Sequence, residues 1–121
     1  MTTTDQPIGF IGLGAMGQPL VRTLARNGFA VVVFDINAAA VEQATQTPGV
    51  SGAGSPREVA ERCERIFSCL PQPEAVEAVY LGSDGVLAAA RPGLITCDHS
   101  SVLPATARKV AAALATKGVQ H

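Results

Sequence analysis

A short apolar segment, Ile8–Leu13, runs into the glycine-rich sequence Gly12–Gly17, which reads Gly-Leu-Gly-Ala-Met-Gly. The following segment, Ala15–Asn27, has apolar residues at helical spacing, and Gly28 supplies a helix stop. A second apolar segment, Ala30–Phe34, is rich in β-branched residues and is typical of a strand buried on both faces. The sequence therefore predicts a strand, a tight turn, a helix and a second strand, which is the opening unit of an α/β fold.

The same alternation continues to the last residues. The strongest local signal is Ser55-Pro56-Arg57-Glu58, in which an N-cap serine, a proline at the first helical position and an acid at the third predict a helix start. Further helices are predicted at Asn37–Thr47, Glu74–Leu81 and Pro104–Lys117, and further strands at Val50–Ala53, Arg65–Leu70 and Leu94–Asp98. This order favours a Rossmann-type, doubly wound parallel sheet with strand order 3-2-1-4-5-6.

One domain accounts for all 121 residues, and we expect it to be incomplete. The sequence stops at Val119-Gln120-His121, where a sixth strand would begin. Without that strand, Leu94–Asp98 would form an exposed apolar sheet edge. We therefore expect a Rossmann domain truncated before its last strand or strands and prone to self-association through this edge.

The glycine loop, in its setting between a strand and a helix, predicts a dinucleotide-binding site. Gly12 permits a tight turn, Gly14 leaves room for the pyrophosphate, and Gly17 allows close packing of the helix on the strand. The helix N-terminus then offers free N–H groups to the phosphates. A packing role alone is the alternative. The loop residues predicted to contact the cofactor are Gly12, Leu13, Gly14, Ala15, Met16 and Gly17.

Asp35 ends the second predicted strand, 18 positions after Gly17. A carboxylate there accepts hydrogen bonds from the adenosine ribose and repels a 2′-phosphate, which favours NAD over NADP. The next residues, Ile36 and Asn37, complete this predicted contact, and the segment to Ala38 has no arginine to receive the phosphate. A solvated loop acid or a helix N-cap is the alternative for Asp35.

Composition excludes several other classes of protein. The chain is 47% hydrophobic, 16% charged and 4% aromatic, with a net charge of −1, which argues against disorder and against a nucleic-acid partner. We expect no membrane span, no metal site and no signal peptide. Three cysteines without ligand spacing, Cys63, Cys69 and Cys97, are expected to be small buried thiols in a protein of the reducing cytoplasm.

The sequence resembles the β-hydroxyacid dehydrogenases, a family that includes 3-hydroxyisobutyrate dehydrogenase and tartronate semialdehyde reductase and, more distantly, 6-phosphogluconate dehydrogenase. The likeness lies in Ile8–Gly17, in Asp35, in Cys69-Leu70-Pro71, and in Asp98-His99-Ser100-Ser101 followed by Pro104. It implies that Leu70, Pro71 and Ser101 line the nicotinamide half of the cofactor, and it leaves Ser100 open between a substrate contact and a helix cap. By themselves these residues would be interpreted as a strand stop and as helix caps.

The resemblance also implies what lies elsewhere. The family's catalytic lysine belongs to a helical domain beyond residue 121, and neither Lys109 nor Lys117 matches its position, so no catalytic residue is predicted in this chain. Ala75 stands where several relatives have an amide-bearing cofactor contact, which implies one hydrogen bond fewer. His99 is expected to pack on a loop or face solvent, and Asp98 to be a structural hydrogen-bonding acid.

Three functions follow. The first is the cofactor-binding portion of an NAD-dependent oxidoreductase that interconverts a small β-hydroxy acid and its semialdehyde or keto acid by hydride transfer. By itself this 121-residue portion is not expected to be catalytically competent. The second is a non-catalytic dinucleotide-binding module. The third is the N-terminal domain of an enzyme similar to the imine reductases, many of which prefer NADP. The substrate and the reaction direction are not encoded in these residues.

Overall fold

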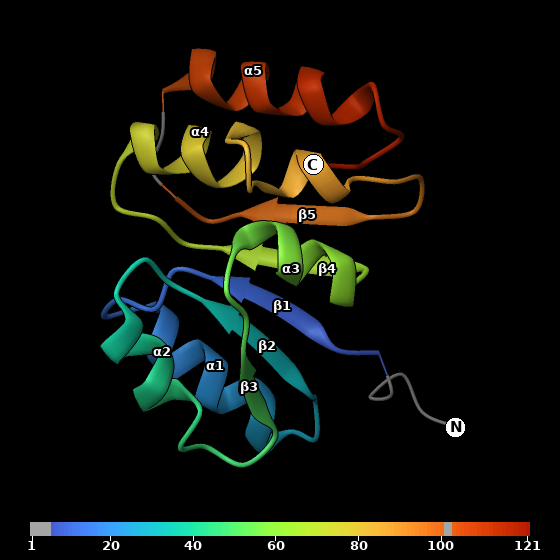
Figure 1. Cartoon of the computed structure of the whole chain (residues 1–121). Coiled ribbons are helices and arrows are strands. Elements are labelled where there is room, and N and C mark those ends of the chain that lie inside the picture. Colours follow the sequence, from blue (N-terminus) through green and yellow to red (C-terminus); the bar gives the residue numbers. More distant parts are fainter. Residues whose placement is uncertain (1–5, 101–102) are drawn as a thin grey trace.

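The computed structural model describes residues 6–100 and 103–121, and its core is one parallel sheet. The sheet has five strands in the order β3-β2-β1-β4-β5 (Figure 1). The strands are β1 (Ile8–Ile11), β2 (Val31–Phe34), β3 (Val50–Gly52), β4 (Arg65–Ser68) and β5 (Ile95–Asp98). The helices are α1 (Gly17–Arg26), α2 (Ala38–Ala44), α3 (Pro56–Arg62), α4 (Pro73–Leu81), the 3₁₀ helix η2 (Val86–Ala89) and α5 (Pro104–Ala115). The predicted α/β class and strand order are confirmed.

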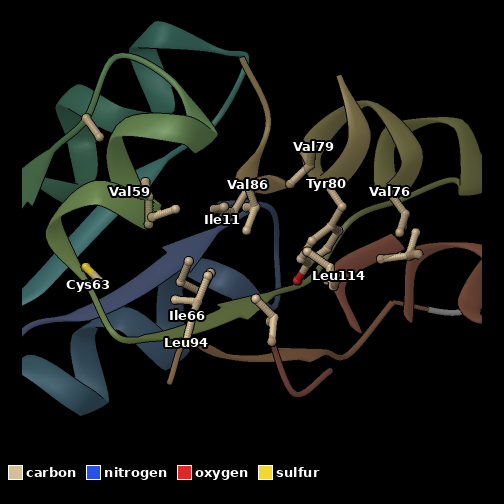
Figure 2. Close-up of a cluster of buried hydrophobic side chains, with 14 of the residues drawn as sticks. Ile11, Val59, Cys63, Ile66, Val76, Val79, Tyr80, Val86, Leu94 and Leu114 are labelled. Atoms are coloured by element: carbon tan, nitrogen blue, oxygen red, sulfur yellow. The ribbon is translucent and has the colours of Figure 1, made fainter. Parts of the chain in front are cut away.

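Alternate residues of the strands pack on opposite faces of the sheet. Phe10, Val31 and Val33 share one buried cluster with residues of α1 and α2. Ile11 and Val32 share the other cluster with residues of α3, α4, η2 and α5. Figure 2 shows this second cluster, in which side chains from the helices meet those of β1 and β4. Burial on both faces explains why the strands are continuous apolar runs in the sequence.

Two of the predicted helix ends have the expected local chemistry. Gly28 has a φ of 93°, which suits a residue just after a helix, and its N–H donates to the carbonyl of Ala25 at 3.1 Å. At the start of α3, the Ser55 hydroxyl accepts the N–H of Glu58 at 3.1 Å. The Glu58 carboxylate reaches one residue further back than a capping box requires and accepts the N–H of Gly54 at 2.9 Å.

Several elements are shorter than predicted. β1 ends at Ile11 rather than Leu13 because Gly12 has a φ of 102°, which no extended strand accommodates. β4 ends at Ser68 rather than Leu70, since the chain there turns away from the ladder. α2 ends at Ala44, ahead of the predicted Thr47. At β1 and β4 local backbone geometry, which hydrophobic periodicity does not reveal, decides the boundary.

The last residues of the chain lie beside β5, at the outer edge of the sheet. Gln120 pairs with Ile95 in parallel fashion: the Gln120 N–H donates to the Leu94 carbonyl at 3.2 Å, and the Thr96 N–H donates to the Gln120 carbonyl at 2.8 Å. A sixth strand position therefore begins where the sequence predicted one. The pairing covers the first half of β5, so the edge is less exposed than expected.

One cysteine expectation is wrong. Cys63 is buried and Cys69 is half-buried, but Cys97 is exposed. The reason is its place on the sheet. Cys97 and Ile95, which is 44% exposed, lie on the same face of β5. The helices on this face, α1 and α2, pack against β1 and β2 and leave these two side chains uncovered. An apolar neighbourhood in the sequence therefore did not ensure burial.

Candidate functional site

The three loop glycines differ in what a side chain would meet. A Cβ added to Gly12 would collide with the backbone oxygen of Cys69, and one added to Gly17 would collide with the backbone oxygen of Gly12. Both positions therefore need glycine for the fold itself. A Cβ on Gly14 would meet nothing within 4 Å. No packing constraint within the described residues explains glycine at position 14, and the space beside it is open to a ligand.

The loop leads into the N-terminus of α1, which lacks a side-chain cap. Met16 is the N-cap residue, it makes no capping hydrogen bond, and its side chain is 67% exposed. No acceptor among residues 6–100 and 103–121 meets the backbone N–H of Gly14, Ala15 or Met16. Unpaired N–H groups at the positive end of a helix dipole form an anion receptor, which suits a pyrophosphate.

Asp35 connects the second strand to this loop. Its Oδ2 accepts the N–H of Leu13 at 2.6 Å, and its Oδ1 accepts the N–H of Asn37 at 2.8 Å. Asn37, in turn, caps α2 by accepting the N–H of Ala39 at 3.0 Å. Each carboxylate oxygen of Asp35 therefore holds one backbone group and keeps a further lone pair for another donor. The sequence did not reveal this loop-holding role.

The opposite side of the site comes from the end of β4. The Cys69 N–H donates to the Ile11 carbonyl at 3.0 Å, which holds the start of this turn against β1. The Leu70 N–H donates to the Ser100 hydroxyl at 2.6 Å. Asp98 accepts from Ser100 and is a structural hydrogen-bonding acid, as expected. The turn is thereby fastened to both neighbouring strands.

A cavity of about 500 Å³ lies between these two sides. It opens at the carboxyl ends of β1, β2 and β4. The strand order reverses at β1, which has β2 on one side and β4 on the other, and open α/β sheets bind ligands at such a point. Its volume falls within the usual range for a small-molecule site. The cavity is lined by Ile11, Gly12, Gly14, Ala15, Met16, Gly17, Phe34, Asp35, Ile36, Cys69, Leu70, Pro71, Ala75, Ala78 and Val79.

Most of the predicted contacts meet in this cavity, but three of the described ones do not line it. Leu13 is 3% exposed and packs in the core beside α1, so only its N–H serves the site. Asn37 caps α2 at the margin. Ser100 lies behind the Leu70 turn. Ser101 lies outside the described residues. Ile36, which does line the cavity, is 92% exposed at its rim.

For one wall of the cavity, sequence reasoning placed only Ala75 beside the cofactor and missed the other residues. Ala75, Ala78 and Val79 come from α4, and their i, i+3, i+4 spacing places them on one face of that helix. The signal was present in the sequence as small residues at helical spacing directly after Pro71. This pattern does not distinguish the two kinds of helix face, because a face that meets a cavity and a face that meets a core are both apolar.

Other polar groups lie away from the cavity. His99 is exposed, and its ring stacks on Phe67 with centroids 5.9 Å apart, as expected for a packing histidine. Within the described part of the chain, no three His, Cys, Asp or Glu side chains are grouped to hold a metal ion. None of the helices formed by the described residues is sufficiently long and apolar to cross a membrane.

The sequence of this domain matches a known protein family. The sequence pattern of the NAD binding domain of 6-phosphogluconate dehydrogenase matches residues 7–121. The chain belongs to this family. It is a dinucleotide-binding domain of the β-hydroxyacid dehydrogenase type, and the resemblance inferred from the motifs is confirmed.

Individual relatives agree with this assignment. The domain is 45% identical to 3-hydroxyisobutyrate dehydrogenase of Pseudomonas aeruginosa, over 93% of this chain and 37% of the relative. It is 38% identical to the NAD-dependent L-serine dehydrogenase of the same organism, over 93% of this chain and 37% of that relative. The structure of Mycobacterium tuberculosis 3-hydroxyisobutyrate dehydrogenase with L-serine superposes with a TM-score of 0.85 at 33% identity, over 95% of this chain and 38% of that one.

The chain spans less than two-fifths of the length of these relatives. A structure of an imine reductase from a Pseudomonas species superposes with a TM-score of 0.81 at 21% identity, over 94% of this chain and 38% of that one, which is a likeness of fold alone.

Proposed function

We propose that this domain binds NAD in the cavity between the glycine loop and the Leu70 turn, as the cofactor-binding portion of a small-β-hydroxy-acid dehydrogenase. One observation carries the proposal. Gly14 faces open space at an uncapped helix N-terminus, so the chain keeps a glycine where its own packing requires none. The pyrophosphate is the group that fits there, because it is anionic and needs close backbone approach.

The preference for NAD over NADP rests on Asp35. Its remaining lone pairs accept the ribose hydroxyls, with Ile36 at the rim and Asn37 beyond it. A 2′-phosphate at the same place would face a carboxylate, and like-charge juxtaposition of this kind costs several kcal/mol. The relatives include both cofactors: one is named an NAD-dependent L-serine dehydrogenase, and a solved relative at 32% identity is in complex with NADP⁺.

The nicotinamide half is assigned to the other end of the cavity. Leu70, Pro71 and the α4 wall supply apolar surface that excludes water. The family resemblance assigns Ser101 to the same half of the cofactor. The nicotinamide supplies the hydride acceptor or donor for the reaction. Ser100 already directs its hydroxyl proton to Asp98, so any substrate contact it makes is as an acceptor.

The substrate class comes from the relatives. Their names include 3-hydroxyisobutyrate dehydrogenase and 2-(hydroxymethyl)glutarate dehydrogenase, whose substrates are small hydroxy acids. We assign the proton-transferring lysine and the substrate pocket to residues outside this chain, which is then the incomplete NAD-binding part of the whole enzyme. The three free cysteines agree with a reducing compartment, for which we propose the cytoplasm.

Calorimetric titration of the protein with NAD and with NADP tests the proposal. We expect NAD to bind at least about tenfold more tightly, because Asp35 repels the additional phosphate. Gly14→Leu should abolish binding of both while melting at the wild-type temperature, since its side chain enters the cavity rather than the core. Equal or tighter binding of NADP would contradict the NAD assignment, and NAD binding by Gly14→Leu would contradict the loop assignment.

A further inference from the structure

A continuous set of side-chain hydrogen bonds lies behind the Leu70 turn. The Tyr80 and Ser68 hydroxyls are 2.6 Å apart, and Ser68 Oγ donates to Asp98 Oδ1 at 2.9 Å. Ser100 Oγ donates to the same oxygen at 2.6 Å, and the Ser100 N–H donates to it at 3.1 Å. Ser100 Oγ then accepts the Leu70 N–H at 2.6 Å. One carboxylate oxygen thus organises groups from β4, α4 and the end of β5.

The last of these bonds replaces a normal sheet contact. In the β4–β5 ladder, the His99 N–H donates to the Ser68 carbonyl at 2.7 Å. In a continuing parallel ladder, the Leu70 N–H would donate next to the carbonyl of residue 99. It donates instead to the Ser100 hydroxyl. The path of the chain beyond β4 is therefore set by a side chain, whose direction is fixed by Asp98.

The same network also holds the wall of the cavity that α4 forms. Tyr80 is fully buried, and its hydroxyl joins α4 to Ser68 of β4. Its neighbour Val79 and the preceding Ala75 line the cavity from that helix. Burial raises the pKa of Tyr80 well above its usual value, so the hydroxyl keeps its proton at physiological pH. The Leu70 turn and the α4 wall, which lie across the cavity from the glycine loop, are consequently both linked to Asp98 by hydrogen bonds.

We propose that Asp98 is a positioning residue for the nicotinamide side of the cofactor site, acting through Ser100 on the Leu70 turn and through Ser68 on α4. The proposal rests on the proposed binding of NAD in this cavity. A charged acceptor suits the role because hydrogen bonds to an anion are short and strong. The adenosine side, formed by the glycine loop and Asp35, shares none of these bonds.

This role can be tested by comparing the binding of NAD with the binding of ADP-ribose. ADP-ribose contains the adenosine half and the pyrophosphate but no nicotinamide. Ser100→Ala removes the hydroxyl that links Asp98 to Leu70, and Ser100→Thr keeps it. Ser83→Ala is a matched control, because Ser83 is exposed and lies outside the network. The readouts are the hydrogen-exchange rate of the Leu70 amide by NMR and the affinities for NAD and ADP-ribose.

For Ser100→Ala we expect at least tenfold faster exchange of the Leu70 amide, about tenfold weaker NAD binding and unchanged ADP-ribose binding. Ser100→Thr and Ser83→Ala should behave like the wild type. If Ser100→Ala lost affinity for NAD and for ADP-ribose to the same extent, the proposal would be overturned, because such a loss would indicate general damage to the fold. Unchanged exchange at Leu70 together with unchanged NAD affinity would also overturn it.

Substitution of Asp98 itself provides the second arm. Asp98→Ala should reproduce the selective loss of NAD affinity, and Asp98→Asn should restore part of it because an amide oxygen still accepts these hydrogen bonds. If Asp98→Ala does not fold, the comparison of Ser100→Ala with Ser100→Thr tests the proposal. Failure of the wild type to bind either ADP-ribose or NAD would refute the proposed function, whereas normal wild-type binding with unaffected variants would refute only the positioning role.

Discussion

The Asp35 carboxylate accepts the backbone N–H of Leu13 across 2.6 Å, which joins the end of β2 to the middle of the glycine loop. The residue assigned to cofactor discrimination is therefore also a structural support for the loop. A substitution that admits NADP by removing the carboxylate would release the Leu13 N–H as well. Cofactor preference and loop geometry are coupled at this position.

Asp35→Ala should lower the free energy of unfolding by about 1–2 kcal/mol, because it leaves the Leu13 N–H without its acceptor. Asp35→Asn should retain part of that stability, since its amide oxygen can accept one of the two backbone N–H groups that the carboxylate holds. Urea denaturation measures both, with Glu42→Ala on exposed α2 as the control for loss of a carboxylate. Equal stability of the alanine and asparagine variants would show that the bond contributes nothing.

Glycine substitutions in the loop should separate into two kinds. Gly12→Ala and Gly17→Ala should each lose more than about 2 kcal/mol of stability, because the new Cβ collides with a backbone oxygen. Gly14→Ala should change stability by less than about 1 kcal/mol, because its Cβ meets open space. Thermal and urea unfolding distinguish them. A Gly14→Ala variant as unstable as Gly12→Ala would contradict the geometry of the cavity.

The N-cap of α3 provides a test outside the site. Ser55→Ala should cost about 1 kcal/mol, since the Glu58 N–H loses its acceptor at the helix start. Ser55→Asp should keep the stability of the wild type, because aspartate is an equally good N-cap. The exposed Ser83→Ala serves as the control in the same denaturation series. A loss in Ser55→Asp equal to that in Ser55→Ala would exclude the capping explanation.

Alkaline pH should destabilise the protein through Cys63. Burial raises the pKa of this thiol from 9.0 to about 11. The unfolded chain then loses the Cys63 proton first, so the contribution to stability is complete below pH 9 and is lost as the pH rises toward 11. Between pH ~8 and pH ~10 the wild type should lose about 1 kcal/mol more than Cys63→Ala. Parallel urea titrations at the two pH values would detect this, and equal losses would contradict it.

The edge of the sheet leads to a prediction about assembly. The described contacts on β5 cover the edge near Leu94–Thr96, and Ile95 and Cys97 remain exposed on one face. We expect the protein to self-associate through this edge, since unpaired strand edges invite pairing. Light scattering should report a mass above that of a monomer for the wild type and a smaller mass for Ile95→Lys. A stable monomer in the wild type would contradict the prediction.

Much of the fold could be predicted because local patterns determine it. Continuous apolar runs such as Ile8–Ile11 identify strands buried on both faces, and signals such as Ser55 and Gly28 locate helix ends. The glycine spacing with Asp35 located one side of the cavity. The sequence indicated Ala75 as a cofactor position and Asp98 as a hydrogen-bonding acid. The remainder of the α4 wall and the partners of Asp98 could not be predicted, because they depend on which helix face and which strand end meet across the sheet.

The sequence alone determined the α/β class, the strand order and the position of the glycine loop, since periodicity and glycine stereochemistry are properties of neighbouring residues. Only the tertiary structure showed which atoms surround the loop glycines: a Cβ at Gly12 or Gly17 would collide with a backbone oxygen, and a Cβ at Gly14 would meet nothing within 4 Å. It likewise showed that Asp35 supports the loop and that Cys97 is exposed. These outcomes depend on distances between segments far apart in the chain, which folding sets through the packing of whole elements.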